Sequence, residues 1–174
     1  MRIVAGRYKG RRLHAPAGRD TRPTADRVRE ALFQRLGSLD GLRVLDLFAG
    51  SGALAIEALS RGARSAVLVD SDPRAVAAIR RNLEPLGADA EVQRRDALAF
   101  LRSYEGPPFD LVLLDPPYSS GARLAGGLAD LLPPVLSDEA RIVTESDKRA
   151  PLPLELPLVD ERTYGQTRVA IHRV

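Results

Sequence analysis

The sequence predicts one α/β domain in which a mainly parallel sheet is covered by helices. Three observations support this prediction. From Leu42 onward, short apolar runs alternate with longer amphipathic ones, as strands and crossover helices do. A glycine-rich turn separates the first strand from the first helix of that series, and the 174 residues, 44% of them hydrophobic, suffice for one ordinary core.

The first half of the expected core runs to the third strand. We expect strands at 43–48, 65–70 and 90–94, with helices at 53–60 and 75–86 between them. Asp72 can cap the second of these helices, with Pro73 in its first position and Gly87 as its end. Because Pro85 lacks an N–H donor, that helix should fray one turn early.

The second half ends in a different pattern. We expect a short helix at 97–101, a strand buried on both faces at 109–115, a helix at 123–132 and a strand at 140–145. Three prolines, at 151, 153 and 157, then mark a loop before an edge strand at 158–162 and a last strand at 167–173. No helix separates these last two strands, which predicts an antiparallel hairpin at the edge of the sheet.

The N-terminal segment, 1–37, is expected to be a basic extension of the catalytic core, 38–174. Strands at 3–5 and 12–14 should form a small hairpin, followed by a helix from Thr24, its N-cap, to Leu36. Residues 1–35 hold ten Lys and Arg residues and three acidic ones, a net charge of +7. This asymmetry favours a polyanion such as RNA, although a solvated arginine-rich surface is the alternative. The candidate RNA-binding residues are Arg7, Lys9, Arg11, Arg12, Arg22 and Arg27.

Composition narrows the class further. No apolar run approaches the roughly 18 residues of a membrane span, and the N-terminus lacks the apolar core of a secretion signal, so we expect a cytoplasmic protein without a membrane partner. With no cysteine and two isolated histidines, we expect no metal site.

The glycine-rich turn at Gly50 and Gly52 indicates a nucleotide-like cofactor. Together with Ala55, and with Asp70 twenty residues after Gly50, it also satisfies the dinucleotide fingerprint of nicotinamide-dependent oxidoreductases. Asp46 argues against that alternative, because its charge at the end of the first strand would repel a pyrophosphate. S-adenosylmethionine carries a sulfonium and an ammonium instead, so an acidic crevice suits it.

Asp70 is then the expected ligand of the ribose diol, and Asp96 the expected partner of the adenine amino group. For Asp96 an ordinary N-cap of the following helix is the alternative. The full set of candidate cofactor-binding residues is Asp46, Phe48, Ala49, Gly50, Ser51, Gly52, Asp70, Ser71, Asp96, Ala97 and Asp115.

The most specific motif is Asp115-Pro116-Pro117-Tyr118, which directly follows an apolar strand. These four residues are the candidate catalytic group. An exocyclic amine conjugates with its base, so its lone pair must be localised before it can attack a methyl group. The Asp115 carboxylate and a carbonyl of the Pro-Pro turn can each accept one N–H, while Tyr118 offers a ring for stacking on an extruded base.

With these motifs placed, the chain resembles the bacterial 16S ribosomal RNA guanine(966)-N2 methyltransferases along nearly its whole length. The matching segments are 2–13, 21–33, 45–63 and 115–118. The tetrad at 115–118 alone is shared with DNA adenine and cytosine amino-methyltransferases. The segments at 21–33 and 45–63, the second of which contains the glycine-rich turn, narrow the resemblance to the ribosomal RNA enzymes. A DNA enzyme would usually need an added target-recognition region, for which the chain has no room.

The resemblance implies a Rossmann-like class I methyltransferase fold, a seven-stranded sheet of order 3-2-1-4-5-7-6 with the last strand antiparallel. It implies S-adenosylmethionine as cofactor and 16S ribosomal RNA, within a small-subunit assembly particle, as substrate and partner of a monomeric enzyme. It also makes Arg22 and Thr24 candidates for closing over the cofactor cleft. We expect no added RNA-binding domain, so recognition should rest on the N-terminal extension and on the shape of the particle. A noncatalytic RNA binder on the same fold is the remaining alternative.

Overall fold

The computed structural model describes residues 1–17, 26–116 and 121–174. Its helices are α1 (Asp26–Leu36), α2 (Ala53–Ser60), α3 (Pro73–Leu83), α4 (Ala97–Arg102) and α5 (Gly121–Leu131). Its strands are β1 (Arg43–Leu47), β2 (Ser65–Asp70), β3 (Ala90–Arg94), β4 (Phe109–Leu114), β5 (Leu136–Asp147), β6 (Leu158–Tyr164) and β7 (Thr167–Arg173). Short 3-10 turns occupy Glu84–Leu86 and Pro133–Val135. No helix in these ranges is long and apolar enough to cross a membrane.

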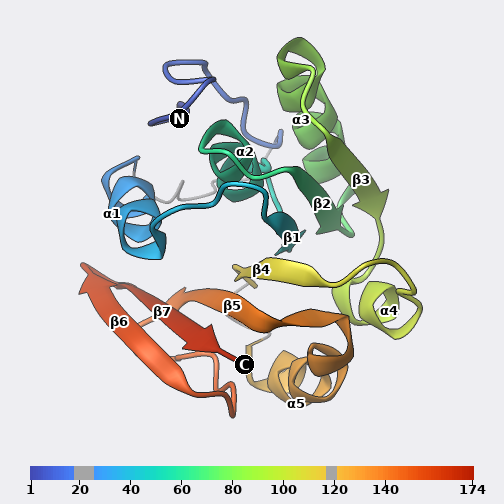
Figure 1. The fold of residues 1–174 in the computed structure, drawn as a ribbon, viewed down its shortest axis with the longest axis vertical. Helices are drawn as coiled ribbons and strands as arrows, with labels where there is room; N and C mark the ends of the chain where they lie inside the picture. The colour runs from blue at the N-terminus through green and yellow to red at the C-terminus, as the bar shows by residue number, and fades with distance from the viewer. Residues whose placement is uncertain (18–25, 117–120) are drawn as a thin grey trace.

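The seven strands form one sheet in the order β3-β2-β1-β4-β5-β7-β6 (Figure 1). The first five in that order are parallel, and β7 is antiparallel to both β5 and β6. The predicted fold class, strand order and closing hairpin are therefore confirmed. The central strand β4 is apolar from Phe109 to Leu114 except at Asp110, which suits a strand with helices on both faces.

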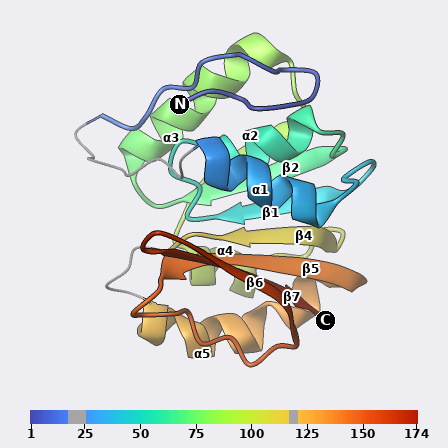
Figure 2. The same ribbon diagram turned by 90° about the vertical axis from the view of Figure 1, so that its left-hand side faces the viewer.

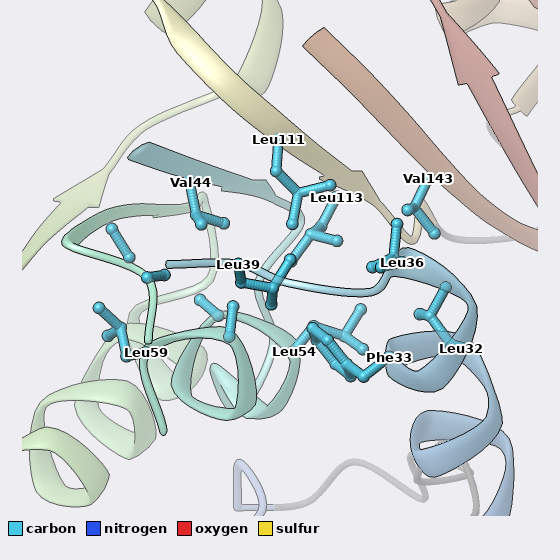
Figure 3. Close-up of a cluster of buried hydrophobic side chains, with 14 of the residues drawn as sticks. Leu32, Phe33, Leu36, Leu39, Val44, Leu54, Leu59, Leu111, Leu113 and Val143 are labelled. Carbon is cyan, nitrogen blue, oxygen red and sulfur yellow. The ribbon is translucent and has the colours of Figure 1, made fainter. Parts of the chain in front are cut away.

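The helices form a layer on each face of the sheet (Figure 2). On one face, α1, α2 and α3 pack on alternate strand residues such as Leu68, Leu111 and Leu113. Figure 3 shows this core, with Phe33 of α1 beside Leu54 of α2. On the other face, α4 and α5 pack on the intervening residues. Because side chains alternate along a strand, each face has its own core, and each strand end presents one residue to each face.

The expected boundaries hold with small differences. The α3 helix begins after the Asp72 cap, whose side chain accepts from the Arg74 N–H, and it ends at Leu83, one turn before the predicted end, as Pro85 requires. The β5 strand starts at Leu136, four residues earlier than predicted, because its first residues still pair beside Phe109 across a register shift. The proposed Thr24 cap lies outside the described residues.

The N-terminal arm, residues 1–17, lies over α2 and α3 (Figure 2), and a single isolated bridge takes the place of the strands expected at 3–5 and 12–14. Arg2 and Arg12 form an antiparallel bridge, and Ile3 accepts from Gly10 while donating to Arg11. The turn sits against the end of α2. A Cβ atom on Gly6, which has φ 80°, would lie 1.7 Å from the Ser60 carbonyl oxygen, so only glycine allows this approach.

Candidate cofactor and substrate site

Four carboxylates line one face of the sheet at the carboxyl ends of four neighbouring strands. Asp70 ends β2, Asp46 lies near the end of β1, Asp115 follows β4 and Glu145 lies near the end of β5. The strand register places all four on the same side, because Asp46 pairs with Leu68 and Leu113, and Leu113 pairs with Val143. The side is that of α1, α2 and α3. We call these four residues the carboxylate edge.

The turn after β1 is held open beside this edge by unusual backbone angles. Phe48 is the one non-glycine residue with positive φ, 68°, in the described ranges, and Gly50 and Gly52 have φ of 57° and 78°. A left-handed phenylalanine is strained, and such strain concentrates at functional sites. Asp70 fixes the turn by accepting from the Gly50 N–H at 2.9 Å. Together with the buried Ala49 and the partly exposed Ser51, these residues form the loop predicted to hold the cofactor.

Asp46 is almost fully buried, with 1% of its surface exposed. It accepts a hydrogen bond from the Ala55 N–H of α2 at 3.2 Å, although six residues separate Asp46 from the start of that helix. Burial raises the pKa of Asp46 to about 7, the Ala55 N–H opposes that rise, and the charge of Asp70 adds to it. A nearby cation would favour the ionised form, so the predicted acidic crevice is one that a positively charged ligand completes.

The pKa of Asp115 is raised as well, for partly different reasons. Its pKa lies well above the ordinary value because of burial first, then the charges of Glu145 and Asp46. Titratable groups with pKa values shifted by burial and a specific charge partner mark functional clefts. The structure therefore brings the predicted catalytic aspartate and the predicted cofactor aspartate to one site.

The remaining predicted residues of this site are placed less uniformly. Asp96 is exposed and caps α4, accepting from the Ala99 N–H at 2.9 Å, while Ala97 begins that helix and is buried. The alternative interpretation of Asp96 as an N-cap is thus realised. Ser71 is exposed just after β2, and Pro116 is buried after Asp115. Pro117 and Tyr118 lie outside the described residues.

The predicted RNA-binding residues form two groups. Arg7, Lys9, Arg11 and Arg12 are exposed on the arm, and Arg27 is exposed on α1. Arg22 lies outside the described residues. Two other basic residues of the extension pair with acids. Arg29 is fully buried beside Glu57 and Asp26, and the exposed Arg35 pairs with Asp160 of β6. The outward charge of the extension is therefore smaller than the sequence count suggests.

Glu145 and Glu57 are the charged residues that sequence reasoning missed. Glu145 was placed at the end of its strand without a role, although an acid at that position was the available signal. Glu57 is fully buried in α2 and accepts from the Val4 and Ala5 N–H groups at 2.7 and 3.0 Å, so it anchors the arm. No pattern in the sequence indicates a partner more than 50 residues away.

A sheet of order 3-2-1-4-5-7-6 with a glycine turn after β1 and carboxylates at the ends of β1, β2 and β4 defines a Rossmann-like class I methyltransferase fold. Among solved structures, "Putative methyltransferase yhhF from Escherichia coli" is similar with a TM-score of 0.85 and 38% identity, covering 99% of this chain and 97% of that one.

Residues 1–173 match the model of the family described as conserved hypothetical protein 95, and the chain belongs to this family. It is 41% identical to the ribosomal RNA small subunit methyltransferase D of Escherichia coli K12, over 99% of this chain and 89% of that protein. It is 37% identical to the protein of the same name from Haemophilus influenzae, over 95% of this chain and 89% of that one. The family resemblance drawn from the motifs is confirmed.

Proposed function

We propose that this protein transfers the methyl group of S-adenosylmethionine to the exocyclic N2 amine of a guanine in 16S ribosomal RNA. The observation that carries the proposal is the position of Asp115 beside Asp46, in a chain that belongs to a family with ribosomal RNA methyltransferases. The family supports RNA methylation, and the tetrad at Asp115 supports an exocyclic amine as the acceptor.

The residues present fit S-adenosylmethionine better than a dinucleotide. Asp46, Asp70 and Asp115 offer carboxylates to a ligand with a sulfonium and an ammonium, whereas a pyrophosphate would meet like charge at short range. Asp46 would hold the charged end, Asp70 and Ser71 the ribose, and Asp96 with Ala97 the adenine. When bound, the cofactor supplies an electrophilic methyl group on a positively charged sulfur.

Asp115 orients the acceptor amine in this proposal. Its carboxylate accepts one N2–H, which draws the nitrogen lone pair out of conjugation and towards the methyl group. An amine that takes the methyl group would gain positive charge while the carbon–sulfur bond breaks and its electron pair stays on the sulfur, which leaves as a neutral thioether. The Asp115 carboxylate would stabilise that charge until the amine loses a proton to water. The carbonyl of the Pro-Pro turn and the ring of Tyr118 are assigned to the second N–H and to base stacking from the sequence motif.

The raised pKa of Asp115 predicts how the rate of the proposed reaction depends on pH. Only the ionised carboxylate can both accept the N–H and stabilise the positive charge. The rate should therefore fall as the pH drops below the raised pKa, and a bound sulfonium should move that pKa down again.

The arm supplies the proposed RNA contacts. Arg7, Lys9, Arg11 and Arg12 are exposed on a hairpin whose backbone is fixed to α2, so their positions relative to the carboxylate edge are set by the fold. Such contacts to phosphates give affinity without sequence specificity. We further propose a small-subunit particle as the substrate, since its shape would then select the guanine, and a monomer as the active form.

Radiolabelled methyl transfer onto small-subunit assembly particles and, in parallel, onto their isolated RNA, followed by nucleoside analysis, tests the proposal. Label in N2-methylguanosine is the expected result. Label in a methylated adenine or cytosine of DNA, offered in parallel, would contradict it in favour of a DNA enzyme. Calorimetry with both cofactors, in which we expect S-adenosylmethionine to bind and the nicotinamide dinucleotides not to, excludes the oxidoreductase or confirms it.

A further inference from the structure

Asn82 is a buried polar residue near the end of α3, and the site described above does not use it. Its side chain is 3% exposed and makes three hydrogen bonds. The Oδ1 atom accepts from the His14 N–H at 2.8 Å, and Nδ2 donates to the carbonyls of His14 and Ser51, each at 2.9 Å. The partners fix the orientation of the amide, because a backbone N–H can only donate and a carbonyl can only accept. One amide thus joins the arm to the glycine turn.

On the side of the turn, Asn82 holds a peptide that is already constrained. The Ser51 carbonyl accepts from Asn82, and the N–H of the same peptide, that of Gly52, donates to the Ala49 carbonyl at 2.7 Å. Gly52 itself is left-handed, with φ 78°, and a Cβ atom there would be crowded, 3.0 Å from Leu68 Cδ2. Because the peptide is held from both sides, losing the donor from Asn82 would release the Ser51 carbonyl and change the shape of the turn.

On the side of the arm, His14 borders the surface to which we assign RNA. A hollow of about 480 Å³ lies beside it, lined by Met1, Arg2, Arg12, Leu13, His14 and Asp26. Arg12 is exposed there. Met1 also reaches the turn directly, with its Sδ atom 3.9 Å from the Ser51 Oγ. An RNA phosphate bound at this hollow would therefore steady the same backbone that Asn82 grips.

We infer that Asn82 is a positioning residue that couples RNA binding on the arm to cofactor binding in the glycine turn, so that each ligand strengthens the other. This inference rests on the proposed function, because it takes the arm as the RNA-binding surface. RNA that orders the arm at His14 leaves less freedom to be lost at Ser51 when the cofactor binds. By thermodynamic linkage the effect must be equal in both directions.

The coupling can be measured with S-adenosylhomocysteine, the unreactive product, and a 16S ribosomal RNA fragment that contains the proposed guanine. Calorimetry gives the product affinity with and without RNA, and fluorescence anisotropy gives the RNA affinity with and without product. For the natural protein we expect each ligand to tighten the other at least about fivefold. In Asn82→Asp, which keeps the acceptor for the His14 N–H but has no donor, we expect the ratio to fall to about one and the product affinity without RNA to fall several-fold.

Val76→Ala is the matched control, since Val76 is a buried residue of the same helix that contacts neither the arm nor the turn through a hydrogen bond. It should lower the melting temperature and leave the coupling intact. His14→Ala should also keep the coupling, because Asn82 binds His14 through its backbone N–H and carbonyl.

Two outcomes would overturn the inference. One is a folded Asn82→Asp variant that retains the coupling, and the other is a natural protein that binds both ligands independently, in which case the proposed function still stands. A natural protein that binds the product but neither binds nor methylates RNA would instead remove the proposed function and the coupling together. The experiment therefore separates the two failures.

Discussion

The two faces of the sheet end in different chemistry, although the same strands build both. Towards α1, α2 and α3, the ends of β2, β1, β4 and β5 carry the carboxylate edge. Towards α4 and α5, the residues one position earlier or later are Val69, Leu47, Leu114 and Thr144, all buried. A shift of one residue thus separates reactive groups from core packing. Side chains alternate between the two faces along each strand, so neighbouring residues at a strand end belong to the site and to the core in turn. Substitutions at neighbouring positions should therefore affect catalysis or binding in one case and stability in the other.

The largest expected effect is on the reactive face, at Asp115. Asp115→Ala should lower the single-turnover methyl-transfer rate at least about a hundredfold, on the scale of one preorganised electrostatic contact. Asp115→Asn should fall between the natural protein and alanine, because its amide oxygen accepts a hydrogen bond but lacks the charge. Rapid-quench assays with labelled cofactor measure both rates.

The matched control lies on the other face of the same strand. Val112→Ala should cost roughly 2 kcal/mol of unfolding free energy while leaving the single-turnover rate of the folded enzyme unchanged. If Asp115→Ala reacts at the natural rate while folded, the tetrad is structural and the proposed mechanism fails.

Asp46 gives the next effect, on binding. Asp46→Asn keeps the shape of the side chain and removes its charge, so S-adenosylmethionine affinity should fall about tenfold, the scale of one hydrogen bond to a charged group. In the natural protein the affinity should weaken as pH falls below about 7, by up to about tenfold per unit, because the cation binds the ionised form of a carboxyl whose pKa burial raises to about 7. Calorimetry between pH 5.5 and 7.5 measures this slope. A variant whose affinity has the same pH slope as the natural protein would show that another group titrates.

The next prediction tests whether the basic arm, which packs on the same side of the sheet as the carboxylate edge, binds RNA. Reversing Arg11 and Arg12 to Glu should weaken RNA binding and flatten its salt dependence by about 0.7 to 0.9 in log–log slope per lost phosphate contact, with cofactor affinity unchanged. Arg102→Glu is the control, because Arg102 is exposed at the end of α4, on the opposite face of the sheet from the carboxylate edge. It should leave the salt slope of RNA binding almost unchanged. An unchanged slope in the double variant would identify the arm as a solvated surface.

The smallest effect belongs to Thr144, the other-face neighbour of Glu145. Its hydroxyl is fully buried and makes no hydrogen bond with the residues that the structure describes. Thr144→Val should therefore raise the unfolding free energy by up to about 1 kcal/mol, visible as an increase of about 2 to 4 °C in Tm by calorimetry. A lower Tm would mean that the hydroxyl has a partner.

The sequence predicted those features whose signals are local. The strand order followed from the family resemblance, and the early end of α3 followed from Pro85. The carboxylates at the ends of β1, β2 and β4 could be placed because a strand end and an acid occur together in the sequence. Glu57 and Asn82 could not be found in that way, because they bind backbone atoms 31 to 68 residues distant, whose need for a partner leaves no trace in nearby composition.

Charged residues could be counted from the sequence, but which of them face solvent could not be predicted. Arg29 was counted in the net charge of +7 of residues 1–35, yet it is buried beside Glu57, because helix α1 presents that position to the arm and to α2. The pKa of Asp46 was equally out of reach, since it depends on complete burial beneath α2 rather than on its neighbours in the chain.

The hydrogen bonds that anchor the arm also determine when it can fold during synthesis of the chain. Its bonds reach from Ala5 to Glu57, from Tyr8 to Ser60 and from His14 to Asn82, the last a separation of 68 residues. During synthesis at about 5 to 20 residues per second, His14 would wait roughly 3 to 14 s for Asn82, 68 residues later. The arm is therefore synthesised before the residues that anchor it, and it can pack on the core only after they have been made.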